Sequence, residues 1–325
     1  MQRRTLLKLA SGGLMLPAAA IARSNDKAPN PASIEPLLDQ FAALNKGNTT
    51  VTLDIRGPNR QQRLTRHGDQ HLFVGSAVKT FILGRYLQEV EAGHLSEDAR
   101  LQVGPEVWSP GGNVFDNVTG NLPARSVLEA MIAHSDNTAT DMVIEAVGPS
   151  KIRETIAAAG LSKTLVPDST RILFSYLNGA PNGQDAGWKG MQALMQGERF
   201  GQLRHPINTE QSMMSSADEM VHWYSHVLSG KLFKQQTTLN EFKRISAMAD
   251  ALPQILPPDI AGYGKGGSIN WNNFYCFAMS GQMVIPDKHT VTFSFITNWE
   301  GEETTVEPVF RQFAAMAKAI IAKTA

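Results

Sequence analysis

Ser76 and Lys79 lie three residues apart at the start of a long apolar stretch, Val74–Val90. A helix places residues with this spacing on one face, so the two side chains can meet in its first turn. There the unpaired N–H groups and the positive end of the helix favour a developing oxyanion and a lowered lysine pKa. A serine hydroxyl becomes a nucleophile when a nearby base removes its proton, and a partly buried, neutral Lys79 could be that base. The alternative is a serine N-cap followed by a solvated lysine.

Two further short motifs accompany this pair. Ser135–Asn137 (SDN) lies at the junction of two predicted helices, and Lys265–Gly267 (KGG) lies at the start of a C-terminal strand region. In this order the three motifs resemble those of class A β-lactamases and penicillin-binding proteins. The resemblance covers nearly all of the chain after its N-terminal segment, and Trp108-Ser109-Pro110 resembles the aromatic-Ser-Pro of that family at the rim of the cleft.

The resemblance implies a catalytic role for each polar residue of the motifs. Ser76 would be the acylated nucleophile and Lys79 its base, or part of the network of that base. Ser135 would pass a proton to the leaving nitrogen. Asn137 would orient Lys79 and bind the side-chain amide of the substrate. Lys265 would supply positive charge near Ser135 and the substrate carboxylate.

The resemblance also places backbone groups and an aromatic ring at the substrate. The N–H groups of Ser76 and Ser268 would form the oxyanion hole, where each donor typically contributes about 3 kcal/mol to the barrier. Gly267 and Trp108 would contact the substrate beside them. Asp136 is expected to brace its own turn.

The sequence departs from the family at the loop that usually holds the deacylating glutamate. The matching stretch is Thr170–Asn178 (TRILFSYLN), and counting four residues back from Asn178 gives Phe174. Alignment on Thr170-Arg171 instead gives Ser175 or Tyr176, so neither alignment supplies a carboxylate. Three acids of the long segment 161–210 could swing in as substitutes: Asp168, Asp185 and Glu198.

Two more departures concern the carboxylate of the substrate. Gly266 occupies a position where the family has Thr or Ser, and Ser268 is the nearest hydroxyl that could compensate. No arginine follows in Asn270–Asn273. We therefore expect an acyl-enzyme to form on Ser76, while its hydrolysis is left open.

Strand patterns occur at both ends of the chain and helical patterns occur between them. Alternating apolar residues predict a strand at Thr49–Ile55 and two more at Phe274–Ile285 and Thr290–Trp299. Helices are predicted at Ile34–Leu44 and Val306–Ala322. The predicted fold is α+β, with one antiparallel sheet built from both termini, flanking helices, and an all-helical subdomain inserted at about residues 93–255.

The inserted region contains several helix signals. Ser126 with Glu129 and Ser216 with Glu219 have the spacing of capping boxes. A further helix is predicted at Thr138–Val147 before Gly148-Pro149, and another at 151–159. With the terminal elements this gives one catalytic domain over residues 34–325, with its site in the cleft between the sheet and the insert.

The first 22 residues have the composition of an export signal. Arg3-Arg4 precede an apolar, glycine-containing run that ends in the small residues Ala20-Ile21-Ala22, which resembles a twin-arginine signal peptide. Residues 23–33 are a polar linker. The sequence therefore predicts a periplasmic or secreted protein without a membrane anchor, and the single Cys276 excludes an internal disulfide.

Charge and motif content exclude other classes. Removing residues 1–22 leaves 27 basic against 30 acidic residues, so no nucleic-acid partner is indicated. His222 and His226 have the spacing of a zinc-binding pair, but Trp223 replaces the glutamate of HExxH, and a half-buried helix face is expected instead. No Gly-x-Ser-x-Gly elbow occurs. We expect a monomer that needs neither cofactor nor metal and acts on a small molecule.

The sequence thus predicts an exported serine hydrolase that forms an acyl-enzyme on a β-lactam or a similar amide. Within the enzymes, the alternative is a D-alanyl-D-alanine carboxypeptidase or esterase, which would use Lys79 in both half-reactions. The alternative outside the enzymes is a penicillin-binding sensor that traps its ligand. The absent loop glutamate and Gly266 favour these alternatives, whereas the complete set of motif residues favours an active site.

Overall fold

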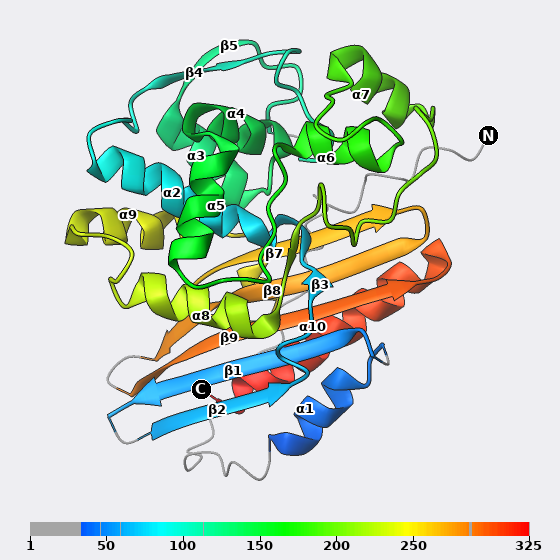
Figure 1. Ribbon diagram of the computed structural model, residues 1–325. Helices are drawn as coiled ribbons and strands as arrows, with labels where there is room; N and C mark the ends of the chain where they lie inside the picture. Colours follow the sequence, from blue (N-terminus) through cyan, green and yellow to red (C-terminus); the bar gives the residue numbers. More distant parts are fainter. Residues whose placement is uncertain (1–33, 46, 59, 113, 286–287, 325) are drawn as a thin grey trace.

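The computed structural model of the protein describes residues 34–324 except positions 46, 59, 113, 286 and 287 (Figure 1). The predicted signal peptide and linker, residues 1–33, lie outside the described residues. Within the described part, no helix is both long enough and apolar enough to cross a membrane.

A five-stranded antiparallel sheet is built from both ends of the chain, as predicted. Its order is β2-β1-β9-β8-β7, which leaves β7 at one edge (Figure 1). The five strands are β1 (Thr49–Gly57), β2 (Arg60–Arg66), β7 (Ala261–Trp271), β8 (Phe274–Ile285) and β9 (His289–Glu300). Because β1 pairs with β9, the N-terminal hairpin and the C-terminal meander form one continuous sheet.

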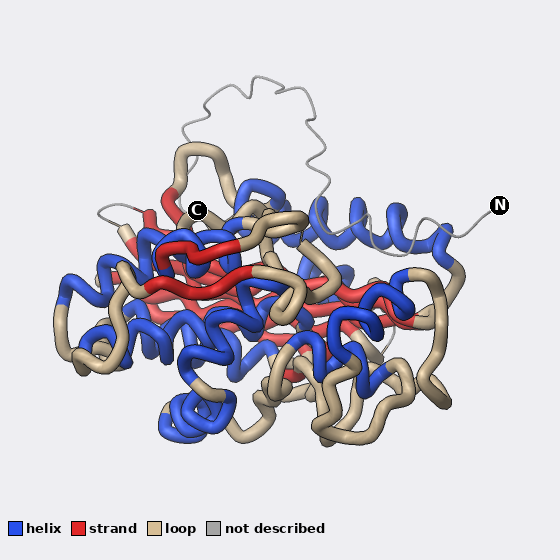
Figure 2. The backbone as a smooth tube through the Cα atoms, turned by 90° about the horizontal axis from the view of Figure 1, so that it is seen from above, coloured by secondary structure: helices blue, strands red, loops and turns tan. Residues whose placement is uncertain are grey.

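The two terminal helices pack together on one face of this sheet. They are α1 (Glu35–Ala42) and α10 (Val306–Ala322). Phe41 of α1 lies at their junction, with ring centroids 5.2 Å from Phe295 of β9 and 5.5 Å from Phe313 of α10. Figure 2 shows helices on both sides of the strands. The termini are therefore held together by a shared aromatic core.

The other face of the sheet supports the chain between β2 and β7, which includes the predicted insert. The helices of this part are α2 (Lys79–Glu91), α3 (Ala124–Ala133), α4 (Asn137–Val147), α5 (Pro149–Ala158), α6 (Thr170–Leu177), α7 (Gly187–Met195), α8 (Ala217–Leu228) and α9 (Gln236–Ser246). Among them α8 lies directly on β1, β8 and β9 (Figure 1). The expected α+β arrangement is confirmed.

Two details of the chain between β2 and β7 differ from the prediction. It contains short strands: β4 (Arg100–Val103) pairs with β5 (Gly120–Pro123), and β3 (Leu72–Phe73) pairs with β6 (Met214–Ser215). The capping box predicted at Ser126 is wrong, because α3 begins earlier, after Pro123, with no side-chain cap. At Ser216 the serine cap is confirmed, since its hydroxyl accepts a hydrogen bond from Glu219 N at 3.2 Å, while the Glu219 carboxylate bonds Lys163 N and Thr164 Oγ1 instead of completing a box.

Helix α2 is the buried helix that its sequence predicted. A single 3₁₀ turn, Gly75–Val78, leads into it, and most of its side chains are fully buried. Gly84 allows a close approach, because a Cβ at this position would lie 2.9 Å from the Trp223 ring of α8. The same ring packs on Phe81 and donates a hydrogen bond to Thr80 Oγ1 at 2.9 Å. The position of α2 is thereby fixed relative to α8 and the sheet.

Candidate active site

The turn that holds Ser76 is pressed against the edge strand β7, and two glycines permit this contact. Gly75 has φ +53°, and a Cβ there would lie 2.9 Å from the backbone of Ser268. A Cβ at Gly267 would lie 2.0 Å from Val74 O and 2.9 Å from Ser76 N. The backbone of the serine turn therefore contacts the backbone of β7 directly, with no side chain between them. The N–H groups of Ser76 and Ser268 lie on these two adjoining segments.

Lys79 is completely buried one turn after Ser76. Its Nζ donates to Ser135 O at 2.6 Å, to Asn137 Oδ1 at 2.7 Å and to Ser135 Oγ at 3.3 Å. Burial lowers the pKa of Lys79 well below its usual value, and the positive charge of Lys265 lowers it further. Lys79 therefore loses its proton more easily than a solvated lysine does, as a general base requires.

Ser135 lies in a tight turn between α3 and α4. Its φ of 58° is unusual for a residue with a side chain. Asp136 stabilises the turn: it caps α4 by accepting from Ala139 N at 2.8 Å, and its other oxygen accepts from Val114 N at 3.0 Å. The bracing role that the sequence suggested for Asp136 is the one that these contacts show.

Asn137 links Lys79 to the opposite wall of the cleft. Its Oδ1 accepts from Lys79, while its Nδ2 donates to Pro110 O at 2.6 Å and its backbone N donates to Gly111 O at 2.9 Å. The amide is thereby held in one orientation, with its oxygen toward the lysine.

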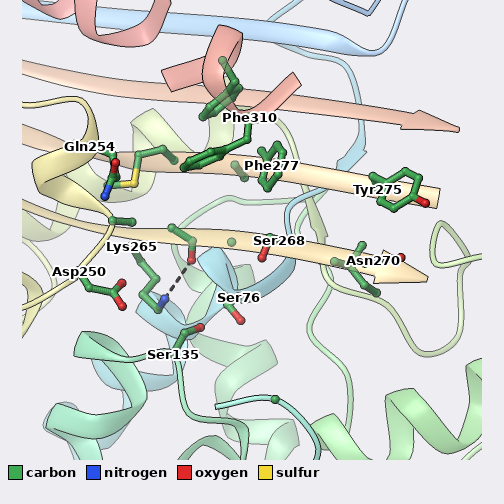
Figure 3. Close-up of a pocket in the computed structure, with 18 of the residues that line it drawn as sticks. Ser76, Ser135, Asp250, Gln254, Lys265, Ser268, Asn270, Tyr275, Phe277 and Phe310 are labelled. Carbon is green, nitrogen blue, oxygen red and sulfur yellow. Dashed lines mark hydrogen bonds between the residues drawn. The ribbon is translucent and has the colours of Figure 1, made fainter. Parts of the chain in front are cut away.

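Lys265 is the second buried lysine of the site and extends from β7 toward Ser135 (Figure 3). Its Nζ donates to Gly266 O at 3.0 Å. Burial lowers its pKa to about 8, and the carboxylate of Asp250 opposes this shift. Near neutral pH, Lys265 is therefore mainly a cation that can lose its proton under mildly alkaline conditions.

A cavity of about 250 Å³ opens beside these groups. Six of the eight residues singled out in the sequence line it: Ser76, Ser135, Asn137, Lys265, Gly267 and Ser268. Lys79 lies behind this surface, beneath Ser135 and Asn137. The fold thus brings together three motifs that are far apart in the sequence.

Trp108, which the resemblance places beside the substrate, packs against another aromatic ring outside the cavity lining. Its ring packs edge-to-face on Trp188 of α7, with centroids 4.9 Å apart, and its Nε1 donates to Asp116 Oδ1 at 3.0 Å. Among the residues that the structure describes, it is not one that lines the cavity. The neighbouring Ser109 is buried and bonded to Thr170 Oγ1 at 2.7 Å, so this motif joins the cleft rim to α6.

The segment that could supply a deacylating acid presents Phe174 to the cavity. Asp168 is paired with Arg153 at 2.7 Å and with Gln211 Nε2 at 2.6 Å, and Asp185 accepts from Arg171 Nε at 3.1 Å. Neither they nor Glu198 is among the described lining residues, whose acidic member is Asp250. The ring of Phe174 instead lies 6.3 Å from that of Trp271 at the end of β7.

Gly266, which stands where the family has Thr or Ser, is closely packed against the segment after α9. A Cβ at this position would lie 2.6 Å from the Cβ of Ala251. The segment after α9 therefore occupies the space that a threonine or serine side chain would need. Ser268 is exposed two residues further along β7.

Two acids near the site were missed by sequence reasoning. Asp141 is buried in α4, accepts from Thr170 N at 2.6 Å and Arg171 N at 3.0 Å, and has its pKa raised to about 6 by burial. It lies one helical turn after Asn137, a spacing that could have suggested it. Asp250 follows α9 and reaches the cavity only through the tertiary fold, so no sequence signal indicated it.

The imidazole rings of His222 and His226 stack on each other on the surface of α8, with centroids 6.2 Å apart. Over the described residues, no group of three or more His, Cys, Asp and Glu side chains is arranged to bind a metal ion. The chemistry available to the cavity is that of a serine, two buried lysines and preorganised backbone donors, which suits acyl transfer.

Comparison with known proteins agrees with this arrangement. A family described as "Beta-lactamase enzyme family" matches residues 34–317. The extended-spectrum beta-lactamase PER-1 of Pseudomonas aeruginosa is 25% identical over 123 residues, 36% of this chain and 40% of the relative. Beta-lactamase VEB-1 of the same organism is 26% identical over 106 residues, 31% of this chain and 35% of the relative. The matches therefore span less than half of either relative.

Solved structures share the fold over most of the chain. The structure of PBP-A has a TM-score of 0.65 at 18% identity and covers 91% of this chain and 97% of its own. A β-lactamase from Chitinophaga pinensis has a TM-score of 0.67 at 16% identity, and the match covers 88% of this chain and 98% of that β-lactamase. At such identities the likeness shows the architecture.

Proposed function

Because this chain belongs to the beta-lactamase enzyme family, we propose that it is a serine hydrolase that forms an acyl-enzyme on Ser76 with a β-lactam or a related amide or ester. The observation that supports this most strongly is the buried, multiply bonded Lys79 one turn after Ser76, beside the N–H groups of β7. Family membership by itself supports the coarser statement of a serine β-lactamase-like or penicillin-binding function.

Lys79 would act first, as the base. A neutral amine has two N–H bonds and one lone pair, and the two shortest contacts of Nζ, to Ser135 O and Asn137 Oδ1, use both N–H bonds. The third position on Nζ faces Ser135 Oγ at 3.3 Å, and the lone pair would take up the proton of the Ser76 hydroxyl once this longer contact is exchanged for one to Ser76. In acylation, Ser76 Oγ bonds to the carbonyl carbon, the bond from that carbon to the leaving nitrogen or oxygen breaks, and the proton reaches the leaving atom through Ser135.

The carbonyl oxygen would become an oxyanion between Ser76 N and Ser268 N. Such preorganised donors typically contribute about 3 kcal/mol each. Lys265 would add positive charge beside Ser135, which favours the developing negative charge while this lysine is protonated.

A second candidate function is a penicillin-binding protein that releases its acyl group slowly. It is favoured by Phe174, which lies in the cavity where the sequence alignment expected an acid. A variant of the structural relative PBP-A has been solved as an acyl-enzyme complex with penicillin G. We further propose that the domain spans residues 34–325, acts as a monomer and is exported through the twin-arginine signal.

The test is intact-protein mass spectrometry with excess penicillin, run beside a chromogenic cephalosporin assay. We expect an adduct equal to the mass of the antibiotic in the native protein and none in Ser76→Ala. Ser225→Ala, at a half-buried position of α8 outside the cavity, is the matched control and should label normally. Sustained turnover would identify a β-lactamase, and a stable adduct would identify the second candidate. Labelling that persists in Ser76→Ala would overturn the proposal.

A further inference from the structure

The cavity beside Ser76 extends to both sides of the edge strand β7. Figure 3 shows Ser76, Ser135 and Lys265 on one side of this strand and Phe277 and Phe310 on the other. All five residues line the same cavity. A substrate held at Ser76 therefore adjoins a second compartment that the acylation chemistry does not use.

The second compartment has an aromatic wall made by β8 and α10. The ring centroid of Phe277 lies 5.1 Å from that of Phe310 and 6.1 Å from that of Phe313. Phe277, Phe310 and the neighbouring Ala314 are only partly buried. Partly exposed apolar side chains that line a cavity next to reactive groups are a typical substrate-binding surface.

The register of the sheet connects this wall to the oxyanion hole. Ser268 is paired directly with Phe277, so the two side chains share a face of the sheet. Ser268 is exposed because β7 has no further strand beyond it. An acyl group whose carbonyl oxygen is bound at Ser268 N can therefore pass over this edge toward Phe277.

The distribution of charge favours an apolar group there. Among the described lining residues, the charged ones are Lys265 and Asp250, and both lie on the serine side of β7 (Figure 3). No arginine lines the cavity in the described part, and Gly266 has no hydroxyl. The second compartment has polar lining groups, including the hydroxyls of Ser268 and Tyr275, but no charged side chain among the described lining residues, so its aromatic wall offers mainly dispersion and burial.

We propose that the preferred substrate carries an aliphatic or aromatic acyl chain that crosses the edge of β7 and packs against Phe277, Phe310 and Ala314. This inference rests on the proposed acyl-enzyme function of Ser76 and specifies its substrate class. The cavity of about 250 Å³ includes both the serine side and this second compartment, so the chain length at which the gain ends measures the space beyond β7.

The test uses p-nitrophenyl esters from acetate to octanoate with the full chain. Ser76 Oγ bonds to the acyl carbon, the carbon–phenolate bond breaks, and p-nitrophenolate leaves while water later releases the carboxylic acid. Each CH₂ group that the compartment buries should raise the second-order rate constant of acylation about fourfold, until the compartment is full. The rate should stop rising once the chain is longer than the compartment.

Ala314→Leu and Ala315→Leu form a matched pair on α10. Ala314 lines the cavity, whereas Ala315 is exposed and does not. Leu at 314 removes space for about three CH₂ groups, so the octanoate-to-acetate rate ratio should fall roughly 50-fold. Ala314→Val should lower it less, and Ala315→Leu should leave it unchanged. Equal ratios in Ala314→Leu and Ala315→Leu would overturn the inference.

A binding measurement separates this inference from the proposed chemistry. Octanamide titrated into Ser76→Ala should bind, and adding Ala314→Leu to that variant should weaken binding while Ala315→Leu does not. Binding of this kind without any adduct in the native protein would refute the acyl-enzyme proposal and retain the apolar compartment. Adducts without a chain-length preference would refute the compartment and retain the acyl-enzyme.

Discussion

At the scale of single residues, the site depends on two buried lysines with different surroundings. Lys79 is held by three oxygens, whereas Lys265 bonds one backbone carbonyl and lies near the carboxylate of Asp250. Burial lowers both pKa values, but the charge of Lys265 also acts on Lys79. Both lysines therefore lose a proton more easily than solvated lysines do, and the charge of Lys265 favours deprotonation of Lys79 further, as a base beside a cationic stabiliser requires.

Asp250→Asn should make the site more sensitive to alkaline pH. The carboxylate raises the pKa of Lys265, which is about 8, so its removal lets this pKa fall. The cation is then lost at lower pH, so the alkaline limb of the acylation profile should move to lower pH, by a small amount because an exposed charge is screened. Asp259→Asn, an exposed acid outside the cavity, is the control. An unmoved alkaline limb would contradict this role of Asp250.

Phe174→Glu should shorten the lifetime of the acyl-enzyme. Phe174 lines the cavity from α6, so a carboxylate there can activate water, and general-base catalysis typically contributes about 10²-fold or more. Ile172→Glu, on the same helix but outside the lining residues, should leave the lifetime unchanged. Adduct decay is followed by mass spectrometry after removal of free penicillin. Equal decay in both variants would show that this position cannot supply the base.

At the scale of elements, the site is the contact between the Gly75–Val78 turn and strand β7. Glycines on both sides of this contact let two backbones meet, so that Ser76 N and Ser268 N lie on adjoining segments. Helix α4 contributes through its start, where the Asp136 cap fixes the positions of Ser135 and Asn137. The precision of the site thus comes from element ends that are closely packed.

Gly267→Ala should separate β7 from the serine turn. Its Cβ would lie 2.0 Å from Val74 O, so backbone must move and the oxyanion donors lose their alignment. Acylation should slow about 10²–10³-fold, the typical effect of losing one such donor. Gly262→Ala is the control on the same strand, since its Cβ meets the flexible end of Leu256. Unchanged acylation in Gly267→Ala, with labelling by mass spectrometry as the measure, would refute this placement.

At the scale of the whole molecule, a sheet from both chain termini supports an insert that contains most of the helices. Ser76 follows the first hairpin, Ser135 lies in the insert, and Lys265 lies on the edge strand. The cavity therefore forms where three distant parts of the chain meet. The edge position of β7 also leaves a route from the nucleophile to α10, which a central strand would block.

The sequence by itself determined the elements and the reactive groups. Alternation gave the three long strands β1, β8 and β9 to within about two residues, and the period of α10 matched Val306–Ala322. Because Ser76, Lys79 and the SDN turn are defined by local spacing, their motifs could be found without a structure. The bounds of the signal segment stay a prediction.

Only the tertiary structure decided what surrounds those groups. Asp250 and Phe174 reach the cavity through packing between elements, and Ala251 fills the space beside Gly266. The ring of Trp108 packs on Trp188, which lies eighty residues later in the sequence, and it does not line the cavity among the described residues. Local spacing cannot encode such contacts, since they depend on how helices from distant segments pack on the sheet.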